Sequence, residues 1–220
     1  MIFHNISFVM RSVFLYNMYS IHISMKIIKY IITIFLFFSI TAYAEDSPDL
    51  FLKKSVREVA QFISENKETL ENDESFLQAK VDELIIPKLD IQLMSKIVLG
   101  KKIWLSINSY QKDKFILAFR GLMVRTYMKS FTVFDGEKIK FEPYTKGKRP
   151  DVAQVKSIYL LSEGSISVNY RLKMNKLNEW KVFDISIDGI SLLRNYRSDF
   201  QNHIEINGIN SLISDLEDKG

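Results

Sequence analysis

The chain has 220 residues, a formal charge of +4 and no cysteine. Without cysteine it can form no disulfide and has no thiolate for nucleophilic catalysis or metal binding, so a folded domain must be stabilised by its apolar core. Apolar residues make up 47% of the chain, which is enough for such a core.

Residues 25–44 have the pattern of a secretory signal peptide. Lys26 and Lys29 precede an uncharged apolar run at 31–40, and the segment ends in Ala42-Tyr43-Ala44. A retained membrane anchor is the competing interpretation, but the run is shorter than the roughly 20 residues that a spanning helix needs. We therefore predict cleavage after Ala44, a mature N-terminus at Glu45 and a location in a Gram-negative periplasm.

Residues 1–24 are interpreted as an extension from an upstream start codon, with an amphipathic N-terminal segment as the alternative. Residues 45–220 then form a single domain. Loss of the leader removes three basic residues and no acidic ones, which leaves 27 basic and 26 acidic residues and a charge of about +1. So small a charge argues against a nucleic-acid partner.

The first half of the mature chain is predicted to be helical. Ser47-Pro48 is a helix start, and apolar spacing continues to about Glu65. Pro87 is expected to end a second helix over 75–86. A third helix is expected to begin after its cap Asp90 and to end at Gly100. The longest helix is predicted over 109–129, with a broad apolar face.

Strands follow, because the apolar period changes from about 3.6 to 2. A hairpin is expected where 131–134 and 138–142 flank Asp135-Gly136. Further strands are predicted at 153–161, 165–174 and 180–187. In the strand 165–174 one face is apolar and the other polar, which is typical of an antiparallel sheet covered on one side.

The last strand, 180–187, is followed by helical sequence that Gly208 interrupts. Alternation places Phe183, Ile185 and Ile187 on one face of this strand. Asp184 lies on the other face, which leaves open whether that face is solvated, buried with a partner or a site of chemistry.

Few residues suit catalysis. His203 is the only histidine after the leader and is interpreted as a surface residue. Asp184 and Asp188 are spaced for paired-carboxylate chemistry, although structural ion pairs with Arg125 or Arg197 are favoured. The basic segment 144–151 is read as a solvated loop in preference to a dock for an anionic group. No metal or cofactor is expected.

Four segments resemble the toluene-tolerance, or MlaC-type, family of periplasmic phospholipid-binding proteins. They are VLGKKIW at 98–104, QKDKFILAFRGLMVRTY at 111–127, WKVFDISIDGISLLRNYRSDF at 180–200 and GINSLISDLEDK at 208–219. Asp199 departs from the family pattern, in which many members have Gln or Glu.

The resemblance implies an α+β fold: a twisted, mostly antiparallel sheet of the nuclear-transport-factor type, with a helical subdomain enclosing an apolar pocket. It implies a carrier without catalysis that moves phospholipid between an outer-membrane lipoprotein complex and an inner-membrane ABC transporter with an MCE-domain component. Periodicity alone does not distinguish a lipid pocket from ordinary core. The alternatives are an enzyme on the same fold, using Asp184, Asp188 or Tyr127, and a chaperone with an open groove for apolar peptides.

With that resemblance, the helix 109–129 is expected to cover the apolar face of the strand 165–174 and to enclose lipid. Asp184 would pair with an arginine and fix the corner at Gly189. The lipid-binding residues predicted are Phe119, Met123, Tyr127, Val168, Tyr170, Leu172, Phe183, Ile185 and Ile187.

Overall fold

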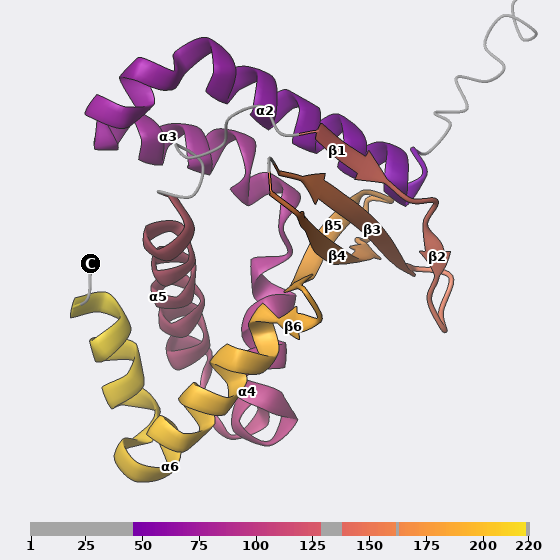
Figure 1. The fold of residues 1–220 in the computed structure, drawn as a ribbon. Coiled ribbons are helices and arrows are strands. Elements are labelled where there is room, and N and C mark those ends of the chain that lie inside the picture. Colours follow the sequence, from indigo (N-terminus) through magenta and orange to yellow (C-terminus); the bar gives the residue numbers. More distant parts are fainter. Residues whose placement is uncertain (1–45, 129–137, 162, 219–220) are drawn as a thin grey trace, which may run out of the picture. The chain divides into compact units, whose positions relative to one another are not determined.

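The computed structural model describes residues 46–128, 138–161 and 163–218, which belong to the compact unit Glu45–Gly220. Helices come first in the chain, then the sheet, then a last long helix (Figure 1). Within the described residues, no helix combines the length and the apolar character needed to cross a membrane. The helices are α2 (Pro48–Asn72), α3 (Glu74–Leu84), η1 (Ile86–Lys88), α4 (Ile91–Ser106), α5 (Ser109–Met128) and α6 (Leu192–Asp218).

The strands form one antiparallel sheet in the order β1-β3-β4-β5-β6, with β2 paired to β3. This confirms the predicted α+β class with its mostly antiparallel sheet. β4 and β5 occupy the predicted ranges, whereas β2 and β6 are two-residue strands that periodicity missed. The strands are β1 (Lys138–Phe141), β2 (Thr145–Lys146), β3 (Val152–Leu160), β4 (Ser165–Met174), β5 (Trp180–Ile187) and β6 (Ile190–Ser191).

The helix boundaries follow from local chemistry. The Asp90 carboxylate accepts a hydrogen bond from the Leu93 amide at 2.9 Å, which is the predicted N-cap of α4. Gly100 ends the first helical segment of α4, as predicted, with the non-helical angles φ +74° and ψ 162°. A second helical segment then continues to Ser106, and its Ile103 and Trp104 pack against the helical core. The predicted turn Asp135-Gly136 and the strand 131–134 lie outside the described residues.

Apolar side chains gather in three clusters. The helical core lies between α4, α5 and α6 and contains Phe115, Phe119 and Phe200. The sheet core lies between α2 and one sheet face and includes Leu52. The third cluster joins α2, α3 and the end of α5, around Ile63. The chain therefore builds its core in separate parts.

The helix that covers the apolar sheet face is α2, and the expectation that α5 does so is wrong. Val168, Tyr170 and Leu172 pack with Leu52 of α2. Phe119 and Met123 of α5 instead pack with α4 and α6. The broad apolar face of α5 is used between helices, and in Figure 1 α2 runs along the sheet beside β1.

A β-bulge alters the faces of β5. Leu172 pairs with Val182 while the neighbouring Arg171 pairs with Asp184, so Phe183 is an extra residue in β5. Ile185 consequently packs in the sheet core, and Phe183 packs in the helical core on the opposite side. The expectation that these two residues share one face is wrong, because strict alternation fails at a bulge.

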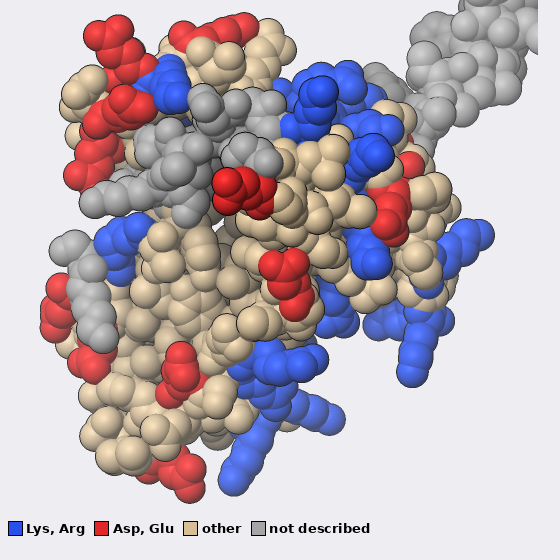
Figure 2. All heavy atoms as spheres, in the orientation of Figure 1, with Lys and Arg blue, Asp and Glu red and all other residues tan. Residues whose placement is uncertain are grey.

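The charges are distributed unevenly over this unit. On the face drawn in Figure 2, acidic residues gather around the joined ends of α2 and α3, and Lys and Arg gather around the sheet. The predicted loop 144–151 contains β2 and the turn after it, where Lys146, Lys148 and Arg149 are exposed. Arg149 pairs with Asp151.

Candidate functional site: an apolar cavity beneath α2

A cavity of about 310 Å³ lies between α2 and the sheet. The helix α2 contributes one continuous, mostly apolar stripe to the lining. Its residues are spaced alternately one and three positions apart, and this spacing places them on one face of a helix. Its members are Phe51, Leu52, Ser55, Val56, Val59, Ala60 and Ile63.

The opposite wall comes from four strands and from the segment before α4. Ile139 of β1, Tyr159 of β3, Tyr170 of β4, and Val182 and Ile185 of β5 form the sheet side. Ile85, Lys88 and Leu89 complete the lining. An engineered apolar cavity of about 150 Å³ stays dry and binds benzene. The cavity beneath α2 has about twice that volume and is partly open to solvent, and its mostly hydrocarbon lining suits an apolar ligand.

Two tyrosine hydroxyls meet at this wall. The Tyr159 and Tyr170 oxygens are 2.8 Å apart and share a hydrogen bond. Burial, with a smaller contribution from Tyr159, raises the pKa of Tyr170 well above its usual range. Tyr170 is therefore neutral at any physiological pH, and the pair adds polarity without charge.

Two of the nine predicted lipid-binding residues, Tyr170 and Ile185, line this cavity. Val168 and Leu172 belong to the same sheet core but are absent from the lining. Ile187 is 42% exposed at the end of β5. The remaining four lie with the helical core: Phe119, Met123, Tyr127 and Phe183.

Sequence reasoning missed the rest of the lining, including the whole α2 stripe and Lys88. The stripe has a signal, since the apolar residues between Phe51 and Ile63 repeat at helical spacing. That signal predicts a buried face but does not say what the face covers. Lys88 has no comparable signal, because one lysine after a proline is common in surface turns.

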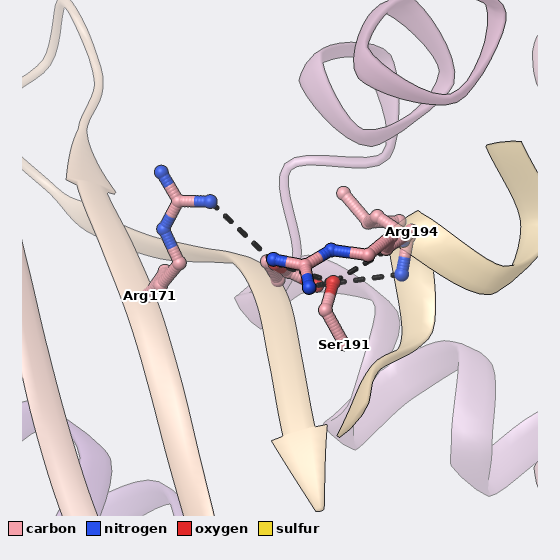
Figure 3. A network of polar contacts seen from close by, with 5 residues as sticks. Arg171, Ser191 and Arg194 are labelled. Atoms are coloured by element: carbon pink, nitrogen blue, oxygen red, sulfur yellow. Dashed lines mark hydrogen bonds and ion pairs between the residues drawn. The ribbon is translucent and has the colours of Figure 1, made fainter. Parts of the chain in front are cut away.

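Asp184 is buried at the corner between β5 and α6. Figure 3 shows this corner, with Arg171 on the sheet and with Ser191 and Arg194 where α6 begins. The Ser191 hydroxyl lies 3.0 and 2.9 Å from the two carboxylate oxygens of Asp184, and the Leu193 amide lies 3.4 Å from Oδ1. The Arg194 amide donates in turn to Ser191 Oγ at 3.2 Å. The carboxylate thereby ties the start of α6 to the sheet.

The arginine partner of Asp184 is Arg171, whose Nη1 lies 3.5 Å from the carboxylate. The prediction of an arginine at this corner is correct, but the choice of Arg125 or Arg197 is wrong. Arg125 donates to the Leu216 carbonyl oxygen at 2.6 Å, and Arg197 lies beside Gly100. Arg171 is the cross-strand neighbour of Asp184, so strand register decides the pair.

The other candidates for chemistry also have structural contacts. Asp188 accepts from the Ser167 amide at 3.0 Å, at a turn where Asp188 itself has φ +47°. His203 is half-buried beside Ser211 and Asp215 instead of lying free on the surface. In the part of the chain that the structure describes, no group of three or more His, Asp or Glu residues is placed to hold a metal ion.

An α+β fold with an apolar cavity between a helix and a sheet is typical of a protein that can bind an apolar ligand. The chain belongs to the MlaC protein family, whose model matches residues 53–218. A Haemophilus influenzae protein, the intermembrane phospholipid transport system binding protein MlaC, is 24% identical over 194 residues, which are 87% of this chain and 90% of that protein.

A solved structure has a similar fold. It is the phospholipid-binding protein from Ralstonia solanacearum in complex with a phospholipid, with a TM-score of 0.72 and 22% identity. The match covers 79% of this chain and 96% of that chain.

Proposed function

We propose that the protein is a phospholipid carrier that holds acyl chain in the cavity beneath α2. The observation that carries this proposal is the cavity itself, whose lining is hydrocarbon apart from Ser55, Lys88 and two tyrosine hydroxyls. The family membership and the names of both relatives support the same ligand class.

The energetics favour enclosure of an acyl chain. Burying one methylene group is worth about 0.8 kcal/mol, so a chain of roughly 16 carbons gains on the order of 10 kcal/mol. The cavity volume is at the lower end of the range of about 300–1,000 Å³ typical of ligand pockets. A gain of that size makes spontaneous loss into water slow, so delivery requires a membrane or a partner protein.

The proposed route runs between two membranes. Residues 25–44 would direct the chain to the periplasm. There it would receive or deliver phospholipid at an outer-membrane lipoprotein complex and at an inner-membrane ABC transporter with an MCE-domain component. This assignment rests on the family and on the leader sequence. A function in outer-membrane lipid asymmetry follows from the same route.

The test is mass spectrometry of ligands that remain bound through purification from the periplasm. The proposal expects diacyl phospholipid in near-stoichiometric amount, together with recovery of lipid by stripped protein from vesicles. A protein that stays empty after incubation with vesicles would contradict it. Ester hydrolysis that is lost on replacing Tyr127 or Asp188 would favour the enzyme alternative.

A further inference from the structure

One pair of opposite charges lies beside the otherwise apolar cavity. Lys88, in η1, is the only charged side chain among the described residues of its lining. Its ammonium nitrogen lies 2.8 Å from Oε2 of Glu58, which is on α2. The pair therefore joins the two elements that flank the cavity.

The backbone around Lys88 is held in place. The Lys88 amide donates to the Ile85 carbonyl oxygen at 2.9 Å, and the Asp90 amide donates to Val182 of β5 at 2.9 Å. The Lys181 ammonium donates to the Pro87 carbonyl oxygen at 2.9 Å. These bonds attach η1 to the edge of β5. The backbone from which the Lys88 side chain extends is therefore held in place at the cavity wall.

The pair itself is weak enough to exchange partners. The Lys88 side chain is 25% exposed and that of Glu58 is 53% exposed. Ion pairs at such positions contribute only about 0–1 kcal/mol, because water solvates both partners. The nearby Lys54 is already paired with Asp46 at 2.6 Å. A ligand bearing both charges can thus replace the contact between Lys88 and Glu58 at little cost.

We infer that Lys88 and Glu58 form a headgroup site for zwitterionic phospholipids that carry a primary ammonium. Lys88 binds the phosphate, Glu58 binds the ammonium, and the acyl chain enters the cavity beside them. A lysine suits this role because it contacts phosphate as a compact charge. This inference rests on the proposed function.

The same geometry disfavours headgroups with a net negative charge. Phosphatidylglycerol offers the phosphate to Lys88 but no cation to Glu58, whose carboxylate then faces a phosphate of like charge. Phosphatidylethanolamine satisfies both side chains. The site therefore discriminates between lipids with identical chains by the charge at the end of the headgroup.

The experiment is a competition between these two lipids. Stripped protein is incubated with vesicles of equimolar dioleoyl phosphatidylethanolamine and dioleoyl phosphatidylglycerol, re-isolated, and analysed for bound lipid by mass spectrometry. The wild type is expected to be enriched in phosphatidylethanolamine. Glu58→Lys should shift the ratio toward phosphatidylglycerol by about fivefold, the scale of one exposed ion pair.

Glu83→Lys is the matched control. Glu83 pairs with Lys80 at 2.7 Å on α3, whereas Glu58 pairs with the cavity residue Lys88, so this variant has the same charge change and should keep the wild-type ratio. Lys88→Gln should lower the amount of both bound lipids, because both carry the phosphate. Should Glu58→Lys fail to fold, Glu58→Gln tests the same point and should give an intermediate ratio.

The outcomes separate the two proposals. Equal headgroup ratios in loaded wild type and Glu58→Lys would overturn the headgroup site and leave the carrier function intact. An equal shift in Glu83→Lys would assign the effect to overall charge and also overturn the site. Wild-type protein that takes up neither lipid would contradict the proposed function itself.

Discussion

The corner between β5 and α6 depends on single side chains. Asp184 accepts both contacts from the Ser191 hydroxyl while lying 4% exposed, and Arg171 approaches it from the solvent side. The guanidinium carbon of Arg171 also lies 4.7 Å from the Phe183 ring centroid. One arginine thus contacts both residues at the bulge, which couples the local backbone to the ion pair.

Asp184→Ala is expected to lower the free energy of unfolding by about 2–3 kcal/mol, since Ser191 and the Leu193 amide lose a buried acceptor. Bound lipid should stay at the wild-type level, because Asp184 does not line the cavity. Urea denaturation and lipid analysis on the same preparation measure both. Asp188→Ala is the control, with a smaller loss expected at its exposed position. Lost lipid at unchanged stability would contradict this assignment.

The burial of Tyr170 leads to a prediction for the free energy of unfolding at alkaline pH. Burial raises the pKa of its hydroxyl in the folded state, so the unfolded chain loses this proton first, near pH 10. The stabilisation is complete below pH 10 and falls above it, by at most about 1.4 kcal/mol per pH unit. Tyr170→Phe should flatten the fall between pH 10 and 11 in denaturation experiments, and an unchanged slope would contradict a buried neutral Tyr170.

At the scale of elements, α2 and α5 show that an apolar helix face does not reveal which element it packs against. Both helices have apolar residues at helical spacing, but α2 covers the sheet and its cavity while α5 packs between helices. Phe119 is fully buried among Phe115, Tyr196 and Phe200. The apolar cavity therefore lies under α2, whereas other side chains fill the space around Phe119 of α5.

The same substitution in the two helices tests this difference. Ala60→Trp extends from α2 into the cavity, where the indole should displace acyl chain and cost little stability. Ala118→Trp in α5 places the same group at a position 5% exposed and should cost about 1–3 kcal/mol through overpacking. Melting curves and lipid-to-protein ratios of both variants provide the measurement. If folded Ala60→Trp retained its lipid, the ligand would not bind in this cavity.

The sequence largely predicts which helices and strands form, but it does not predict which of them pack together. Periodicity predicts β4 and β5 over their observed ranges, and capping chemistry predicts the start of α4 at Asp90. The bulge at Phe183 has no signal in an alternating pattern, so the faces of β5 were misassigned beyond it. Which helix covers the sheet depends on contacts distant in sequence, and this explains why Phe119, Met123 and Tyr127 of α5 do not line the cavity.

For the molecule as a whole, the leader gives a direct prediction. The pattern Ala42-Tyr43-Ala44 predicts that the exported protein begins at Glu45. Intact-mass measurement of protein taken from the periplasm should match residues 45–220. A species that retains Met25 or any earlier residue would contradict both the cleavage site and the proposed export.

The three apolar clusters meet at the short segment 86–89, between α3 and α4. Ile86 packs against both the helical core and the third cluster, and Leu89 packs against both the helical core and the sheet core. A segment shared in this way loses support when any one cluster opens. Amide hydrogen exchange at 88–90 should therefore follow the least stable cluster. If lipid stabilises α2 against the sheet, loading will slow exchange there while leaving the amides of α5 unchanged.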